Sequence, residues 1–192
     1  MASVVLHDNR LKGITPVHYD RRWLATNKNP IDDIIAWVWY EGRKSPVWPL
    51  HILCHGYQSK WFTSSDGTWK VTAHGGFGLA LGKNDLTIHN VHKTKDWKGR
   101  VELIVLFACA PADDTLQGKV PGQFGDGRAF CRKLFEYSGA TVIAARETQY
   151  YYLDNGVIDF EDWEGPVFAF DAKTPNGRQL VHPNVYRLLR KK

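Results

Sequence analysis

One cysteine and one histidine each follow a short hydrophobic segment of this chain, and together they could carry out nucleophilic catalysis. His55 follows residues 49–54, and Cys109 follows residues 101–108. Because a thiolate is a strong nucleophile and histidine titrates near neutrality, such a pair can perform acyl transfer without a metal. Both segments are unbroken apolar runs, as in buried parallel strands, and such sheets bind ligands beyond the carboxyl ends of their strands. We therefore expect His55 and Cys109 to meet at one edge of a sheet.

The three cysteines differ in their sequence surroundings. Cys54 lies in a predicted strand and Cys131 in a predicted helix, and a buried cysteine usually packs as a small apolar side chain. Cys109 instead ends the most hydrophobic segment and precedes a long loop, a setting in which binding and catalytic residues are frequent. Cys109 is therefore the candidate nucleophile, and a structural cysteine is the alternative for this position.

Two histidines in the first segment compete for the role of base. Alternation along a strand puts His51 on one face with Leu53 and leaves His55 at the mouth of the sheet, beside Gly56. We expect His51 to be a buried, hydrogen-bonded histidine and His55 to reach the cleft. The spacing of three further histidines matches no closed metal site, and we expect neither a metal nor another cofactor: His74, His89 and His92.

The rest of the chain supplies the elements that must position this pair. Strands are predicted at residues 4–6, 49–54, 101–108, 140–145 and 166–170, and helices at residues 31–41, 89–100, 126–137 and 184–190. Hairpins are predicted at residues 75–88 and around the Asp-Asn-Gly turn at 154–156. Polar residues 57–68, at the rim of the cleft, and glycine-rich residues 111–127 are predicted loops. This order favours a parallel α/β sheet in a single domain that covers residues 1–192.

Charge and hydropathy argue against two classes of partner. The 192 residues carry a formal net charge of +5, but the basic residues are scattered among acids except at the very end of the chain. We therefore expect no nucleic-acid partner, and a basic nucleic-acid binder is only a third alternative. No run of about 18 apolar residues occurs and the N-terminus lacks a signal-peptide pattern, so we expect no membrane contact. Three cysteines without paired spacing suit a reducing compartment, and the expected location is cytoplasmic or reached by a signal-peptide-independent route.

Four segments in a fixed order resemble the caspase-like cysteine peptidases, particularly the bacterial CHAT-type branch: residues 50–56, 78–87, 103–109 and 139–145. In that family a His-Gly ends one strand and an Ala-Cys or Ser-Cys ends the next. Cys109 follows His55 by 54 residues, from position 55 to position 109, near the interval of about 50 typical of caspases. Papain-like enzymes place the cysteine first, and the Gly-x-Ser-x-Gly motif of α/β-hydrolases is absent.

The resemblance implies a fold and a reaction. The fold would be an α/β three-layer sandwich with a mainly parallel sheet, helices on both faces and small β-hairpins. Cys109 would attack a scissile carbonyl, His55 would pass the proton to the leaving amine, and the amides of Gly56 and Cys109 would hold the oxyanion. The protein would then be a cysteine endopeptidase whose partner is a protein or peptide substrate, with room for an activating protein.

The chain departs from this family at positions that set specificity. Phe107 stands where metacaspases have an aspartate, and residues 107–111 do not match the Gln-Ala-Cys-Arg-Gly pattern of caspases. Three acids near the site could bind a basic substrate side chain, and they are the candidate substrate-binding residues: Asp113, Asp114 and Glu147. The alternative to an enzyme is a catalytically inactive relative that serves as an interaction module through its aromatic surface.

Overall fold

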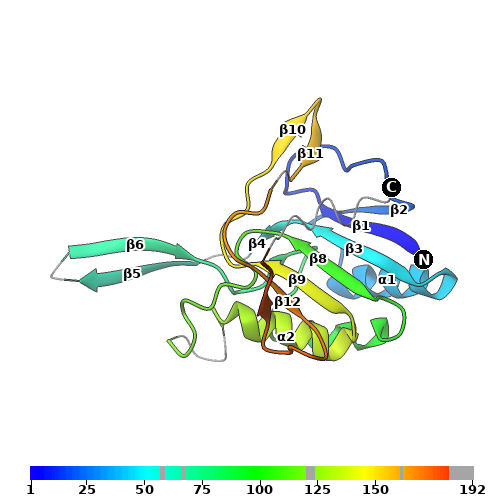
Figure 1. Cartoon of the computed structure of the whole chain (residues 1–192). Coiled ribbons are helices and arrows are strands. Elements are labelled where there is room, and N and C mark those ends of the chain that lie inside the picture. Colours follow the sequence, from blue (N-terminus) through cyan, green and yellow to red (C-terminus); the bar gives the residue numbers. More distant parts are fainter. Residues whose placement is uncertain (57–58, 66–67, 120–123, 161, 182–192) are drawn as a thin grey trace.

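A seven-stranded, mostly parallel sheet forms the centre of the molecule (Figure 1). The computed structural model describes residues 1–56, 59–65, 68–119, 124–160 and 162–181. From one edge to the other, the strands are β13 (Arg178–Gln179), β12 (Val167–Phe170), β9 (Thr141–Ala145), β8 (Leu103–Phe107), β3 (Val47–Leu53), β1 (Ala2–Asp8) and β2 (Arg21–Ala25). The five strands from β9 to β2 are parallel, whereas β12 and β13 are antiparallel to their neighbours.

Three helices accompany this sheet in the described residues, and local sequence signals account for two of them. Helix α1 (Ile31–Lys44) has acids in its first turn and bases in its last, which suits the helix dipole. In α2 (Gly127–Ser138), the side chain of Asp126 accepts a hydrogen bond from the amide of Ala129, and Gly139 ends the helix at a φ of 69°. Between them, residues 91–97 form the 3₁₀ helix η1 (Val91–Trp97).

The first helix is predicted to end at residue 41, before Gly42, but α1 continues to Lys44. A Cβ on Gly42 would lie 2.8 Å from the Cβ of Arg100. Glycine is therefore present because another segment approaches closely, and its role here is not to terminate the helix.

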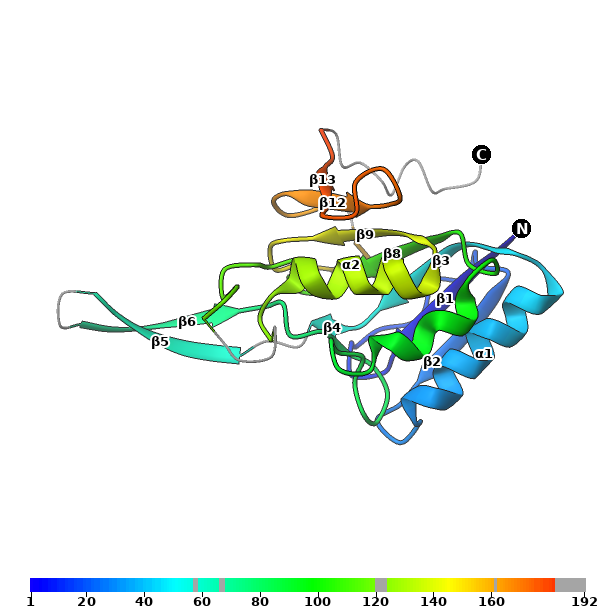
Figure 2. The same ribbon diagram turned by 90° about the horizontal axis from the view of Figure 1, so that it is seen from below.

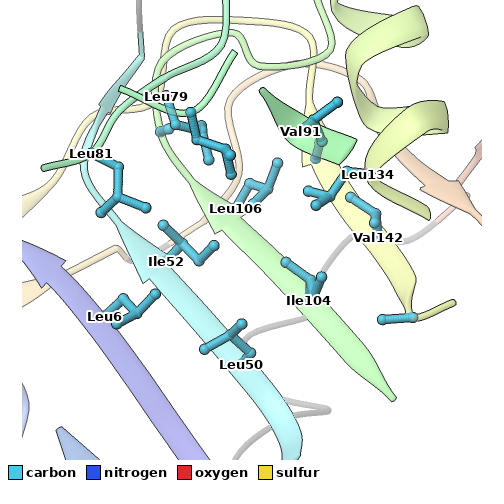
Figure 3. Packing of buried hydrophobic residues seen from close by; sticks show 14 of the residues in the cluster. Leu6, Leu50, Ile52, Leu79, Leu81, Val91, Ile104, Leu106, Leu134 and Val142 are labelled. Carbon is cyan, nitrogen blue, oxygen red and sulfur yellow. The ribbon is translucent and has the colours of Figure 1, made fainter. Parts of the chain in front are cut away.

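All three helices lie on one face of the sheet (Figure 2). Apolar side chains of alternate strand positions fill the space between them, and Figure 3 shows Leu50 and Ile52 of β3 next to Ile104 and Leu106 of β8. Leu134 of α2 packs in the same cluster. This layer accounts for the apolar residues of strands and helices that the sequence pattern predicts to be inward.

The opposite face of the sheet has a different cover. Its core includes Val105 and Phe107 of β8, and it is closed by Leu11 and Tyr19 of the loop after β1 and by Ile158 of a hairpin. That hairpin consists of β10 (Tyr152–Asp154) and β11 (Val157–Asp159), as the Asp-Asn-Gly turn predicts. Within the described part of the chain, helices therefore cover one face and not both. The predicted helix at residues 184–190 lies outside the described residues.

Two further pairs of strands leave the sheet near its carboxyl edge. Strand β4 (His55–Gly56) pairs with β7 (Leu79–Ala80), and β5 (Ser59–Ser65) pairs with β6 (Thr68–His74) in a hairpin that extends away from the body (Figure 1). The prediction of a loop over residues 57–68 is thus wrong for β5: strand propensity of its tryptophan, phenylalanine and threonine prevails over the polar composition. The hairpin predicted at 75–88 is reduced to β7 and a bridge from Leu79 to Leu86.

None of the helices among the described residues has both the length and the apolar character needed to cross a membrane.

Candidate active site

The positions of His55 and Cys109 follow directly from the register of two neighbouring strands. In the parallel pair of β3 and β8, Leu53 lies opposite Phe107. His55 and Cys109 each come two residues later, so both leave the sheet at the same carboxyl edge. The amide of Cys54 donates to the carbonyl of Phe107 at 3.2 Å and extends the contact between the two chains. Side chains at this edge of a parallel sheet are well placed to meet a ligand.

His55 and Cys109 line one pocket with a volume of about 210 Å³. The rest of its lining comes from Leu11, from Cys54 and Ala108 beside the pair, from residues 148–151 and from Phe160. The pocket is formed by four separate segments that follow β1, β3, β8 and β9, together with Phe160 after β11.

Cys109 is partly exposed and sits at a sharp change of chain direction. Its thiol donates to the carbonyl oxygen of Gln149 at 3.6 Å. The next residue, Ala110, has a φ of 49°, which is the left-handed region that non-glycine residues rarely adopt. Hydrogen bonds hold it there: the Ala110 amide donates to Glu147, and the Ala110 carbonyl accepts from Gly76, each at 3.0 Å. This turn directs the Cys109 side chain out of the sheet and into the pocket.

The Gln149 side chain fixes the segment that faces the cysteine. Although Gln149 is buried, its amide group is satisfied. Nε2 donates to the carbonyls of Glu147 at 3.0 Å and Glu164 at 2.9 Å, and Oε1 accepts from the amide of Glu164 at 3.1 Å. These bonds join the chain after β9 to the chain before β12 and position the Gln149 carbonyl beside Cys109.

His55 is exposed, and a backbone carbonyl defines its tautomer. Its Nε2 lies 3.1 Å from the carbonyl oxygen of Arg10. Since a carbonyl can only accept a hydrogen bond, Nε2 carries the proton in the neutral ring and Nδ1 has the free lone pair. The neutral imidazole is therefore oriented with one nitrogen able to accept a proton.

The side chain of Arg10 is itself anchored. Its Nε donates to Asp8 at 2.8 Å and its Nη2 donates to the other carboxylate oxygen of Asp8 at 3.0 Å, while Nη2 also contacts Asp85 and the carbonyl of Gly82. Asp8 is fully buried, at the end of β1. Burial alone would raise the pKa of Asp8, but the hydrogen bonds from Arg10 and from the Gly82 amide lower it overall. Asp8 is therefore ionised and holds Arg10 in place.

Gly56 lies directly against the main chain of Cys109. A Cβ at position 56 would be 1.8 Å from the Cys109 carbonyl oxygen and 2.7 Å from its carbonyl carbon. No side chain fits in this gap, so the two segments that carry the candidate base and nucleophile touch backbone to backbone. Glycine at position 56 is a steric requirement of the site.

The remaining cysteines and His51 have the structural roles predicted for them. Cys54 and Cys131 are buried, and burial raises the pKa of both thiols. His51 is buried and its Nδ1 is hydrogen-bonded to the hydroxyl of Tyr19. Burial, with a smaller effect of His18, lowers the pKa of His51 to about 3. These groups stay neutral at physiological pH, whereas His55 is exposed, Cys109 is partly exposed and both line the same pocket.

Asp113, predicted to bind substrate, instead forms hydrogen bonds with backbone amides and stabilises the loop after the cysteine. It is buried, and one carboxylate oxygen accepts from the amide of Gly75 at 2.8 Å. The other oxygen accepts from the amide of Thr115 at 2.9 Å. Asp113 does not line the pocket of Cys109.

Asp114 and Glu147 also lie outside the lining of that pocket. Asp114 forms ion pairs with Arg128 at 2.9 Å and Arg146 at 3.3 Å. Glu147 is exposed, and it reaches the site only through its backbone carbonyl, which accepts from Ala110. The structure therefore does not bring the three predicted acids together around the candidate nucleophile.

No protein-family model, curated protein or solved structure matches this chain. Within the described residues, no group of three or more histidine, cysteine, aspartate or glutamate side chains could hold a metal ion.

Sequence reasoning missed Asp8, Arg10 and Gln149. One signal was present for the first two: β1 is parallel to β3, with His7 opposite Leu53, so residues just after β1 must emerge at the same sheet edge as His55. Gln149 carried no such signal, because its partner Glu164 lies 15 residues away across an irregular segment.

Proposed function

We propose that this protein is a caspase-like cysteine peptidase in which Cys109 is the nucleophile and His55 the general acid and base. The observation that carries the proposal is that both side chains line one pocket at the carboxyl ends of adjacent parallel strands. The order of the chain also supports it, since the histidine follows β3 and the cysteine follows the neighbouring β8.

The proposed reaction begins with proton transfer. Nδ1 of His55 accepts the thiol proton of Cys109, and the thiolate adds to the scissile carbonyl carbon. The amides of Gly56 and Cys109 hold the resulting oxyanion. The imidazolium then gives its Nδ1 proton to the leaving amine as the C–N bond breaks, which leaves an acyl-enzyme. Water, deprotonated by His55, hydrolyses the thioester and restores the thiol.

The Arg10 carbonyl would assist at each step. It accepts from Nε2 of His55 in the neutral ring and can keep that bond when the ring is protonated. A fixed acceptor of this kind stabilises the imidazolium and prevents the ring from turning its protonated nitrogen toward the thiol.

The test is labelling of the protein with an electrophilic peptide probe, followed by intact-mass and peptide mapping. We expect one adduct on Cys109, loss of the adduct in Cys109→Ala, and labelling at least 10²-fold slower in His55→Ala. Cys54→Ala, which removes the buried thiol that also lines the pocket, is the matched control and should still be labelled. An adduct that persists in Cys109→Ala would refute the proposal.

A non-catalytic interaction module is the second candidate, and one contact favours it. The thiol of Cys109 is hydrogen-bonded to the Gln149 carbonyl, which suits a protonated resting cysteine. The two candidates differ in the effect of His55 on the thiol. If iodoacetamide alkylates Cys109 equally fast in the wild type and in His55→Ala at pH 7, the interaction module is favoured, whereas a clear slowing favours the dyad.

A further inference from the structure

We infer that the pocket beside Cys109 accepts an uncharged, apolar side chain, so that the protein cleaves after an apolar residue rather than after an acidic or basic one. The inference rests on the proposed peptidase function. It concerns the side chain of the residue whose carbonyl is attacked, because that side chain is the one held next to the nucleophile.

The floor of the pocket is apolar. Leu11 and Phe160 line it and are 3% and 6% exposed, so both belong to the core of the molecule as well as to the pocket. Among the described residues that line the pocket, none is an aspartate, glutamate, lysine or arginine. An apolar substrate side chain would find matching surface there, whereas a charged one would lose water without gaining an ionic partner.

A second aromatic layer supports this floor from below. The ring centroid of Phe107, two residues before the cysteine, lies 5.0 Å from the ring centroid of Phe160. It also lies 5.0 Å from the ring centroid of Trp163, and the Phe107 and Trp163 rings are stacked. The imidazole of His51 meets Phe107 edge-on at 5.1 Å and is neutral. The side chains that pack behind Phe160 are thus uncharged, which makes the desolvation of a charged substrate group next to it unfavourable.

Two charged side chains near the pocket, those of Arg10 and Glu164, have other partners. Arg10 is bound to Asp8 and Asp85, and its guanidinium also contacts a backbone carbonyl. The carboxylate of Glu164 accepts from the amide of Tyr150 at 3.2 Å and does not line the pocket. None of these side chains is presented to a substrate side chain at the pocket wall.

The size of the pocket suits a single side chain. Its volume of about 210 Å³ is roughly seven times the ~30 Å³ that one water molecule takes up in the liquid. The pocket could therefore hold roughly seven groups the size of a water molecule, and a phenylalanine side chain has about as many heavy atoms. The rim is also apolar in character, because Tyr150 is 63% exposed there and Tyr151 packs against Phe160 with ring centroids 5.7 Å apart.

The experiment uses four acyloxymethyl-ketone peptides that are identical except for the residue at the attacked carbonyl, which is Leu, Phe, Asp or Arg. The rate of Cys109 labelling is measured for each probe with the full chain. We expect the Leu or Phe probe to react at least tenfold faster than the Asp and Arg probes. A faster reaction of the Asp or Arg probe overturns the inference and leaves the peptidase assignment intact.

A binding measurement separates failure of the inference from failure of the proposed function. The same four sequences, as unreactive carboxamides, are titrated into Cys109→Ala by calorimetry. If no probe labels the wild type but the Leu or Phe peptide binds at least tenfold tighter than the others, the peptidase assignment fails and the pocket preference stands. If the carboxamides show no such preference, the inference is overturned.

A substitution that adds a charge at the rim tests whether the residues of this pocket determine which probe is preferred. Tyr150→Glu adds a carboxylate at an exposed lining position, and the relative rate of the Arg probe over the Leu probe should rise at least tenfold. The matched variant is Tyr40→Glu, which adds the same charge at an exposed tyrosine of α1, outside the pocket. An equal shift in both variants would show a long-range charge effect and would contradict the assignment of the pocket.

Discussion

The Nε2 of His55 donates a hydrogen bond to the carbonyl oxygen of Arg10 at 3.1 Å, so the end of β1 sets the tautomer of the candidate base that follows β3. The side chain of Arg10 is tied to the buried Asp8 by two hydrogen bonds. The ion pair of Asp8 and Arg10, whose residues do not line the pocket, thus anchors the residue whose carbonyl sets which nitrogen of His55 is free to accept a proton.

Removal of the Arg10 side chain should affect both stability and reactivity. Arg10→Ala leaves the carboxylate of Asp8 buried without its cationic partner, and we expect a loss of about 2 kcal/mol in the free energy of unfolding, less than for a fully buried pair because Arg10 is one-third exposed. Labelling of Cys109 should slow as the carbonyl loses its anchor. Urea unfolding and probe kinetics measure the two effects.

The control for this prediction is Asp85→Asn, which removes the more exposed carboxylate of the cluster. Its ion pair with Arg10 spans 3.2 Å near the surface, and such pairs contribute about 0–1 kcal/mol. If Asp85→Asn slows labelling as much as Arg10→Ala does, the positioning role of the Asp8 pair is disproved.

A methyl group at position 56 should disable the site. In Gly56→Ala the new Cβ would overlap the carbonyl oxygen of Cys109, 1.8 Å away, so the two segments must move apart. We expect Cys109 labelling to fall at least 10²-fold, because misplacement of about 1 Å has effects of that size. Gly99→Ala is the comparison: no atom lies within 4 Å of its Cβ, and its φ of 73° should cost about 1 kcal/mol without slowing labelling. Normal labelling of Gly56→Ala would refute this reading.

The buried His51 predicts a dependence of stability on pH. Its pKa is about 3 in the fold and about 6.5 in an unfolded chain, so the unfolded state binds more protons between these values. Stability from this residue is complete above pH 6.5 and falls as the pH drops toward 3, by about 2 kcal/mol between pH 7 and pH 5. His51→Gln should remove that part of the slope in urea unfolding measured at the two pH values.

The control for the histidine is Tyr19→Phe. This variant removes the hydroxyl that bonds to Nδ1 of His51 but leaves the imidazole buried, so the slope should persist at reduced stability. A slope that is unchanged in His51→Gln would assign the pH dependence to other groups, such as His7, whose pKa burial also lowers.

The three thiols should differ sharply toward a small alkylating reagent. Cys54 and Cys131 are buried, with pKa values raised by burial, whereas Cys109 is partly exposed. Iodoacetamide at pH 7.5 should therefore modify Cys109 in the native protein and all three cysteines only after unfolding. Peptide mapping reads the result, and modification of native Cys54 ahead of Cys109 would contradict it.

Much of the fold follows from apolar patterning. The runs that became β3, β8 and β9 are continuous because those strands are covered on both faces, and this pattern is readable without any structure. By contrast, β2 was not predicted, because an edge strand with exposed Arg21 and Arg22 has no apolar run. The hairpin β5–β6 was missed because the serine and glycine content of residues 57–68 suggests a loop.

The site was only partly predictable for a related reason. His55, Gly56 and Cys109 could be placed from strand ends, since the ends of parallel strands converge wherever the intervening chain goes. The partners Arg10 and Gln149 depend on how irregular segments fold back on the sheet edge, and local propensity does not specify that. Asp113 was predicted to bind substrate because it follows the cysteine closely in the sequence. In the fold, however, its two carboxylate oxygens accept hydrogen bonds from the backbone amides of Gly75 and Thr115.

The contact of Gly56 with the Cys109 main chain means that the frame of the site does not depend on the sulfur atom. Cys109→Ala removes the reactive sulfur atom only. The contact of Gly56 with the main chain of residue 109, the turn at Ala110 and the hydrogen bond between His55 and Arg10 keep all their atoms. The inactive variant should therefore serve as a trap, able to retain a bound peptide long enough to isolate it from a complex mixture and to read its sequence.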